Sequence, residues 1–312
     1  MSDQRTHPRI VFMGTPEFAV ASLDALIQAG YPIVAVITAP DKPAGRGMQL
    51  NESAVKKYAK EKGLTILQPE KLKNPVFLEE LHSLQADLQI VVAFRMLPEA
   101  VWNMPPMGTI NLHGSLLPQY RGAAPINWAV INGDKETGIT TFKLQHDIDT
   151  GNILLQDRFP IHETDTAGDV HDRMKEIGAR LLVRTIDSLV KGELKEHPQD
   201  TLADGTSLRH APKLVTDTGR IDWTKSAEEI YNLIRGLSPF PAAYTQLDGK
   251  LLKVYRSEKE ITPPSIAPGE YATDKKTWLK FAAADGYIHL TEIQLEGKKR
   301  MKIEDFLRGY RF

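Results

Sequence analysis

The sequence predicts an α/β fold, with a parallel-rich sheet in the N-terminal part of the chain and a small β-barrel in the C-terminal part. Near the start, a short apolar run at residues 9–13 is followed by a helical pattern at 17–29 and a second apolar run at 33–38. This strand–helix–strand order is typical of parallel sheets with right-handed crossovers. In the last third, five short strand-like runs are separated by Gly, Pro and Asp turns, which fits a small barrel.

The N-terminal elements continue in the same alternation. A second helix is predicted at residues 54–62, where a glycine follows, and buried strands are predicted at 88–94 and 109–112. Further along, a strand at 153–161 precedes a long helix at 166–191. That helix carries apolar residues at helical spacing, namely Val170, Met174, Ile177, Leu181 and Leu182.

A change in composition divides the chain. Residues 192–210 are polar and turn-rich, so we predict that they form a linker between a domain at 1–191 and a domain at 211–312. Within the second domain a helix is predicted at 226–236. The five strands of the predicted barrel follow at residues 243–247, 251–256, 269–272, 278–282 and 287–294.

Composition excludes several classes of protein. The chain has 312 residues with 41% hydrophobic content, which is enough for a sizeable core, and no apolar run reaches the length of a membrane span. Residues 1–9 are polar, unlike a signal peptide, and the absence of cysteine rules out disulfides and thiolate metal sites. We therefore expect a cytoplasmic protein, and a monomer.

The charge distribution leaves RNA binding open. The net charge of −1 does not by itself indicate a nucleic-acid-binding protein, although residues 201–312 are slightly basic. Phosphate binding needs local basic faces rather than a basic whole. An RNA-binding face and an ordinary solvated surface both explain the basic clusters of the C-terminal part. These clusters are Lys250, Lys253 and Arg256; Lys275, Lys276 and Lys280; and Lys298, Lys299, Arg300 and Lys302.

The most informative motif is INLHGSLLPQYRGAAP at residues 110–125, which is followed by HDIDTG at 146–151. The amide of Asn111 can donate to a carbonyl oxygen that gains negative charge during acyl transfer. His113 points to the same side of a strand end, and Asp149 can accept from its imidazole or take a proton through water. Because there is no thiol, direct transfer is the simpler interpretation. The alternative is that His113 is a hydrogen-bonded structural residue.

The predicted place of these side chains favours a binding site. In an open α/β sheet, ligands bind at the carboxyl ends of the strands, where residues 94–97 and 111–113 are expected to lie. A Gly-Thr-Pro sequence follows the first strand, but the chain has neither a G-x-G-x-x-G nor a G-K-[ST] motif. The interpretations of this chain as a dinucleotide-dependent dehydrogenase or as a P-loop enzyme therefore lose their main support.

Five segments together resemble the methionyl-tRNA formyltransferase family. They are NLHGSLLPQYRGAAP (111–125), IDTG (148–151), RIVFMGTPEFAV (9–20), DKPAGRGMQL (41–50) and APKLVTDTGRIDWTKSAEEIYNLIRGLSPFPAAYT (211–245). The SLLPxYRGAAP core is specific to folate-dependent formyl transfer, and the PAGRG loop and the C-terminal part narrow the resemblance to the tRNA enzyme. The resemblance runs nearly end to end. It implies a Rossmann-like formyltransferase domain followed by an OB-like β-barrel domain that binds tRNA.

The resemblance also implies a reaction and its site. A formyl group would pass from 10-formyltetrahydrofolate to the amino group of initiator methionyl-tRNA, in the cytoplasm and without a metal. Asn111, His113 and Asp149 would form the catalytic set. The folate would lie against two segments, Ser115, Leu116, Leu117 and Pro118, and Phe94, Arg95, Met96 and Leu97. The second segment departs from the family, because many relatives read AYGxILP whereas this chain reads AFRMLP and is one residue shorter.

The PAGRG segment is a candidate RNA contact. Its glycines and prolines favour a flexible loop, and it carries the charged Lys42 and Arg46. In the family the matching loop enters the tRNA acceptor stem, and Arg46 aligns with its key arginine; the alternative is a surface loop without a partner. Lys298 and Lys299 are the candidate RNA contacts of the barrel.

Two other functions remain open at this point. One is a folate-dependent formyltransferase that acts on a glycinamide ribonucleotide or a nucleotide-linked amino sugar. The other is a catalytically silent RNA-binding protein.

Overall fold

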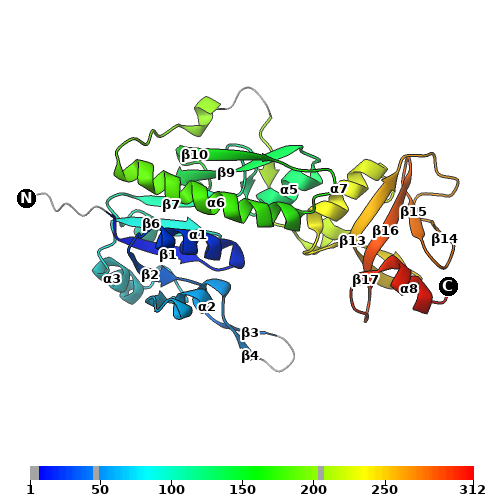
Figure 1. The fold of residues 1–312 in the computed structure, drawn as a ribbon, viewed down its shortest axis with the longest axis horizontal. Helices are drawn as coiled ribbons and strands as arrows, with labels where there is room; N and C mark the ends of the chain where they lie inside the picture. The colour runs from blue at the N-terminus through cyan, green and yellow to red at the C-terminus, as the bar shows by residue number, and fades with distance from the viewer. Residues whose placement is uncertain (1–6, 45–48, 203–206) are drawn as a thin grey trace, which may run out of the picture. The chain divides into compact units, whose positions relative to one another are not determined.

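The computed structural model describes residues 7–44, 49–202 and 207–312 (Figure 1). The chain divides into two compact units. The N-terminal unit comprises Met1–Arg121, Gly138–Arg158 and Asp172–Arg209, and the C-terminal unit comprises Gly122–Thr137, Phe159–His171 and His210–Phe312. Two segments from the middle of the sequence therefore belong to the C-terminal unit.

A seven-stranded sheet organises the N-terminal unit. Its strands are β1 (Ile10–Gly14), β2 (Ile33–Ile37), β5 (Ile66–Leu67), β6 (Leu88–Val92), β7 (Thr109–His113), β9 (Glu136–Lys143) and β10 (Ile153–Pro160). Their order is β10-β9-β7-β6-β1-β2-β5. The five strands from β7 to β5 are parallel, whereas β9 runs antiparallel to β7. The predicted α/β fold with a parallel-rich sheet is confirmed.

The helices of this unit include the three predicted at 17–29, 54–62 and 166–191, and two short ones that were not predicted. They are α1 (Glu17–Gln28), α2 (Ala54–Glu61), α3 (Pro75–Ser83), α4 (Glu99–Trp102) and the long α6 (Ala167–Val190), whose first turn belongs to the C-terminal unit. Ser53 caps α2 and Asn74 caps α3, each by accepting a backbone N–H of the first turn. A small hairpin pairs β3 (Lys42–Ala44), which contains the first two residues of the PAGRG segment, with β4 (Gln49–Asn51).

The middle strands of the sheet are buried along their whole length. Every residue of β1 and of β6 is buried, as expected for parallel strands with both faces covered. At the end of β1, a Cβ on Gly14 would lie 2.6 Å from the Cβ of Ala19, so only glycine permits the observed approach of α1. Helix α1 thus begins directly at the carboxyl end of the first strand.

Helix α6 packs against one face of β7. Gly178 lets the helix approach the sheet closely, because a Cβ there would lie 2.5 Å from Ile139 and 3.0 Å from Leu112. Leu112 therefore faces α6. Since side chains alternate along a strand, Asn111 and His113 face the other side of the sheet together.

The C-terminal unit contains a six-stranded antiparallel sheet. Its strands are β12 (Ala243–Leu247), β13 (Lys250–Glu260), β14 (Tyr271–Thr273), β15 (Leu279–Ala282), β16 (Tyr287–Leu295) and β17 (Met301–Lys302). The order is β12-β13-β16-β15-β14, and β17 pairs with β16. Strand β13 is longer than predicted, and its register against β16 shifts on both sides of Arg256. Such bulges bend a strand, and the sheet is curled into a half-barrel that is consistent with the predicted OB-like fold (Figure 1).

Three helices complete the C-terminal unit, namely α5 (Pro125–Ile131), α7 (Ala227–Leu237) and α8 (Ile303–Gly309). Helix α7 begins with a capping box in which Ser226 and Glu229 each accept the other's backbone N–H. In the core, the Trp223 ring stacks on Phe281 with centroids 4.7 Å apart. The remaining short elements are β8 (Arg121–Gly122), β11 (His210–Ala211) and the 3-10 turns η1 (Gln199–Leu202) and η2 (Thr216–Gly219).

None of the helices in the described residues has both the length and the apolar character that crossing a membrane requires.

Candidate active site

The carboxyl ends of β6 and β7 bring two of the predicted motifs together. The strands are parallel neighbours, with Val92 opposite Leu112. Residues 94–97 follow β6 almost directly, and residues 111–113 end β7. The predicted folate-binding segment and the predicted catalytic segment thus lie at the same edge of the sheet, which is where open α/β sheets bind ligands.

His113 is buried at this edge, with 7% of its surface exposed. Its Nε2 atom lies 2.9 Å from the carbonyl oxygen of Tyr120. A carbonyl oxygen can only accept, so Nε2 carries the proton and donates. In the neutral ring the unprotonated nitrogen is therefore Nδ1, which is the nitrogen on the side of Asp149.

Asp149 approaches the imidazole without touching it. The distance from its Oδ2 to Nδ1 of His113 is 3.9 Å, and the two side chains are mostly buried. This is longer than a hydrogen bond. The direct bond that the sequence suggested is not made, and the tautomer of His113 is set by the backbone of Tyr120 instead. Asp149 itself has φ of +55°, a left-handed conformation that is uncommon for a residue with a side chain.

Asn111 offers an unused amide. The side chain is half-buried, and it makes no hydrogen bond within the described part of the chain. It lies two residues before His113 on the same face of β7. Its N–H groups can therefore bind an incoming oxygen without breaking a bond in the protein.

The SLLP loop is held by hydrogen bonds from β9 and β10. The Thr140 hydroxyl donates to the carbonyl of Ser115 at 2.7 Å, and the Gln156 amide donates to the carbonyl of Leu117 at 2.9 Å. The Ser115 hydroxyl is itself bonded to the carbonyl of Gln119 at 2.6 Å. Ser115, Leu117 and Pro118 are buried, so their side chains are largely withdrawn from solvent.

The AFRML segment divides its side chains between the core and the surface. Phe94 and Leu97 pack against the hydrophobic cluster beneath the sheet edge, whereas Met96 is 72% exposed. Arg95 donates to the backbone carbonyls of Pro69 and Glu70. Its Nε is buried without a hydrogen-bond partner, and burial lowers the pKa of its guanidinium from the ordinary value.

Three polar side chains that no motif pointed to hold the loops of the site. Thr140 lies on β9, a strand that was not predicted from the sequence, and Gln156 lies on β10, which was predicted as a strand at 153–161. Gln199 lies in the segment predicted as a linker, yet it is 2% exposed and bonds to the backbone of Asp149 and Gly151. These contacts join residues far apart in the chain, so no local sequence pattern indicates them.

The candidate RNA contacts lie away from these residues in the chain, and only some can be described. Lys42 is exposed on β3, and Arg46 lies outside the described residues. Lys298 and Lys299 are exposed in the turn between β16 and β17, where the Gln294 amide donates to the carbonyl of Lys298 at 3.0 Å. The two lysines belong to the C-terminal unit, whereas Asn111, His113 and Asp149 belong to the N-terminal unit.

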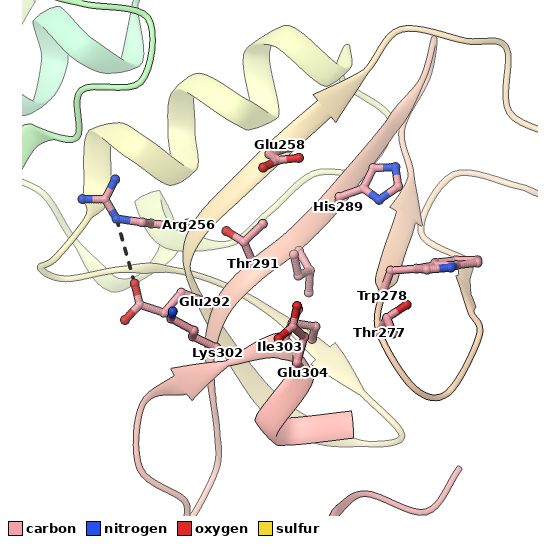
Figure 2. A pocket seen from close by; sticks show the side chains of 11 residues that line it. Arg256, Glu258, Thr277, Trp278, His289, Thr291, Glu292, Lys302, Ile303 and Glu304 are labelled. Atoms are coloured by element: carbon pink, nitrogen blue, oxygen red, sulfur yellow. Dashed lines mark ion pairs between the residues drawn. The ribbon is translucent and has the colours of Figure 1, made fainter. Parts of the chain in front are cut away.

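A hollow of about 570 Å³ lies on the C-terminal sheet, and Figure 2 shows the side chains that line it. It is lined by Trp278 and His289, and by Arg256 and Glu292, whose Nε and Oε2 atoms are 3.9 Å apart. None of the predicted site residues lines it. In the part of the chain that the structure describes, no three His, Asp or Glu side chains are grouped so that they could hold a metal ion.

A parallel-rich sheet that gathers an amide, an imidazole and a carboxylate near the ends of its strands has the architecture of an α/β group-transfer enzyme. The model of the formyl transferase family matches residues 8–186, and the model of the formyl transferase C-terminal domain matches residues 213–311. The chain belongs to the formyl transferase family.

Bacterial relatives match the chain along nearly its whole length. The chain is 58% identical over 310 residues to the methionyl-tRNA formyltransferase of Phocaeicola vulgatus, an alignment that covers 97% of this chain and 96% of that protein. It is 53% identical over 307 residues to the methionyl-tRNA formyltransferase of Bacteroides fragilis, with 97% and 95% covered.

Solved structures with lower identity share the fold. The N-formyltransferase from Helicobacter canadensis, in complex with folinic acid and dTDP-3-aminofucose, superimposes with a TM-score of 0.68 at 20% identity, over 94% of this chain and 100% of that chain. Glycinamide ribonucleotide transformylase 1 from Symbiobacterium toebii gives a TM-score of 0.53 at 21% identity, over 62% of this chain and 92% of that chain.

Proposed function

We propose that this protein transfers the formyl group of 10-formyltetrahydrofolate to the amino group of initiator methionyl-tRNA. The observation that carries the proposal is the placement of Asn111, His113 and Asp149 near the carboxyl end of one strand, with His113 and Asp149 3.9 Å apart. The choice of acceptor is supported by the two bacterial relatives, which are methionyl-tRNA formyltransferases. The choice of donor is supported by the SLLPQYRGAAP motif.

In this proposal Asn111 stabilises the developing charge. The folate supplies the formyl group, bonded to one of its nitrogens. As the amine of the methionyl group adds to the formyl carbon, the carboxamide of Asn111 donates to the carbonyl oxygen, which is becoming negative. Because that carboxamide has no other partner in the described structure, it can donate to the substrate without breaking a bond within the protein.

His113 moves the proton. Its Nδ1 takes a proton from the attacking amine, since Nε2 is committed to the carbonyl of Tyr120. The ring is then positive and lies beside the Asp149 carboxylate, which stabilises it. His113 returns the proton to the folate nitrogen as the bond between that nitrogen and the formyl carbon breaks. The net change is one formyl group moved to the amine and one proton moved to the folate.

Two segments would hold the folate. The Ser115 hydroxyl and the Ser115 and Leu117 carbonyls are engaged within the protein, so residues 115–118 would present mainly their remaining backbone groups. On the other side, residues 94–97 would contact the folate through backbone groups and through the exposed side chain of Met96.

The RNA would be bound largely by other parts of the chain. We infer that the domain at 1–191 carries the chemistry and the domain at 211–312 binds RNA, with 192–210 between them. Lys42 and Arg46 would contact the acceptor stem, and Lys298 and Lys299 would contact phosphates. The exposure of the three lysines supports these roles. A monomer in the cytoplasm suffices for this reaction, since one chain carries both parts.

The acceptor is tested by supplying 10-formyltetrahydrofolate with three acceptors in parallel, which are initiator methionyl-tRNA, glycinamide ribonucleotide and a dTDP-linked amino sugar. We expect formylation of the tRNA alone. Formylation of a small acceptor instead of the tRNA would show that the proposed acceptor is wrong and that formyl transfer is still the reaction. Binding of tRNA without formylation of any acceptor would indicate a silent RNA-binding protein.

The folate site is tested separately by hydrogen exchange. Bound folate should slow exchange of the backbone amides at both 94–97 and 115–117, although the two segments are distant in sequence. Protection confined to the C-terminal unit would contradict the proposed site.

A further inference from the structure

The carboxamide of Gln199 makes all of its hydrogen bonds within the N-terminal unit. Its Nε2 donates to the carbonyl oxygens of Asp149 at 2.7 Å and Gly151 at 2.8 Å. Its Oε1 accepts from Arg121, at 3.0 Å from Nε and 2.7 Å from Nη2. A carboxamide has two donor hydrogens and two acceptor lone pairs, so all four are satisfied.

The loop that carries Asp149 depends on such an anchor. Residues 145–148 just before it are exposed, and Asp149 adopts the left-handed conformation, which is unfavourable for most residues with a side chain. Gly151 permits the close return of the loop, because a Cβ there would lie 1.7 Å from the carbonyl oxygen of Lys143. Gln199 binds the carbonyls on both sides of Thr150 and so holds the loop in this conformation.

The other end of Gln199 reaches the segment that orients His113. Arg121 directly follows Tyr120, whose carbonyl oxygen accepts from Nε2 of His113. One side chain therefore connects the backbone that carries the carboxylate to the backbone that fixes the imidazole. The two segments lie 50 and 78 residues from Gln199 along the chain.

We infer that Gln199 is a positioning residue for formyl transfer, which sets the place of Asp149 relative to His113 by holding the two loops together. The inference rests on the proposed function of that pair. It also gives residues 192–210 a role in the active site, through a side chain that touches neither the formyl group nor the amine.

Gln199→Glu removes the hydrogen bonds at one end of the side chain and keeps the interaction at the other end. The carboxylate keeps its attraction for Arg121 but has no N–H to donate to the loop carbonyls. We expect kcat to fall about tenfold to a hundredfold, since displacements of about 1 Å can have such effects, while KM for methionyl-tRNA stays within about twofold. Gln28→Glu, the same change of charge on an exposed residue at the end of α1, should leave kcat unchanged. Gln199→Met has a side chain of similar length that makes none of the four hydrogen bonds. It replaces Gln199→Glu in the kinetic comparison if that variant does not fold.

A double mutant distinguishes positioning from general destabilisation. If Gln199 acts through Asp149, then Gln199→Glu should change kcat by less than about threefold in an Asp149→Asn background, because the two effects are not additive. The same large factor in both backgrounds would overturn the inference.

A second test, by NMR spectroscopy, does not depend on catalytic turnover. In the labelled full-length protein, the Nδ1 resonance of His113 should shift in Gln199→Glu and not in Gln28→Glu; an unchanged resonance would also overturn the inference. If the wild-type protein formylates no acceptor, the proposed function fails, and this resonance still reports whether Gln199 positions the pair.

Discussion

The backbone carbonyl of Tyr120 accepts a hydrogen bond from Nε2 of His113 at 2.9 Å. In serine hydrolases a carboxylate fixes the histidine tautomer, whereas here a main-chain oxygen has that role. The consequence is that Nδ1, rather than Nε2, is available to accept a proton. It also leaves Asp149, at 3.9 Å, to act as a nearby negative charge instead of a hydrogen-bond partner.

Replacing Asp149 by alanine should lower kcat by about a hundredfold or more, because the charge beside the protonated imidazole is lost. The side chain lies on a loop outside the core, so the melting temperature should change little. Steady-state kinetics and thermal unfolding measure the two effects. Asp147→Ala, an exposed neighbour on the same loop, should behave like the wild type. Near-normal turnover in a folded Asp149→Ala protein would remove the catalytic role.

Replacing Asn111 by alanine should lower kcat by about a hundredfold to a thousandfold, the usual loss for one oxyanion donor. Because the Asn111 amide has no partner within the described protein, its removal leaves no unsatisfied group behind. Single-turnover formyl transfer at saturating substrates is the measurement. Asn103→Ala, at the exposed end of α4, is the matched control. Equal loss in both variants would indicate a structural effect only.

Gly151→Ala should displace the loop that carries Asp149. The new Cβ would start 1.7 Å from the carbonyl oxygen of Lys143, so the backbone must shift, and kcat should fall about tenfold or more. Gly309→Ala, where nothing lies within 4 Å of the new Cβ, should have normal kinetics. Both variants are compared by kcat and by circular dichroism. Full activity of Gly151→Ala would show that the loop position is not critical.

Arg46→Ala should lower kcat/KM for methionyl-tRNA while folate affinity stays unchanged. Replacing Lys298 and Lys299 by alanine should instead weaken tRNA binding and flatten its dependence on salt, since each phosphate contact contributes to that slope. Kinetics and binding are measured with initiator and elongator methionyl-tRNA. Arg46→Ala should affect the two RNAs unequally, whereas the lysine variants should weaken both alike. An intact kcat/KM for the initiator in Arg46→Ala would exclude a recognition role.

The stability of the C-terminal sheet should depend on pH through Glu292. Hydrogen bonds from Arg300, at 2.7 and 2.8 Å, hold the pKa of Glu292 below its ordinary value of 4.5. A carboxyl group whose pKa is lower in the folded state stabilises the protein above its unfolded pKa, and this contribution is lost as the pH falls through the folded pKa.

Glu292→Gln should therefore unfold more easily than the wild type at pH 7, by about 0.5 kcal/mol for a partly exposed pair. The difference should shrink as the pH falls below 4.5, the ordinary value. Urea unfolding at several pH values measures it. A difference that stays constant down to the acid transition would show that the pair does not contribute.

Much of the fold follows from local patterns. The apolar runs at 9–13, 33–38 and 88–94 form strands because continuous hydrophobic stretches suit the middle of a covered parallel sheet. The five short runs from residue 243 onward form strands of the curled antiparallel sheet of the C-terminal unit, because each is a short run of strand-forming residues with polar turns on either side. The antiparallel pairing of β9 with β7 was not indicated, because the direction of a neighbouring strand depends on a long connection rather than on its own residues.

The candidate site divides in the same way. The sequence alone determined that Asn111 and His113 share one face, because the period of a strand is two residues, and that polar motifs would gather at the carboxyl ends of β6 and β7. Only the tertiary structure decided which nitrogen of His113 is free and what holds Asp149. Those answers depend on the carbonyl of Tyr120 and on Gln199, 50 residues away from Asp149. Hydrogen bonds between loops depend on which residues lie close together in space. They do not depend on a repeating pattern in the sequence, so the sequence alone does not predict them.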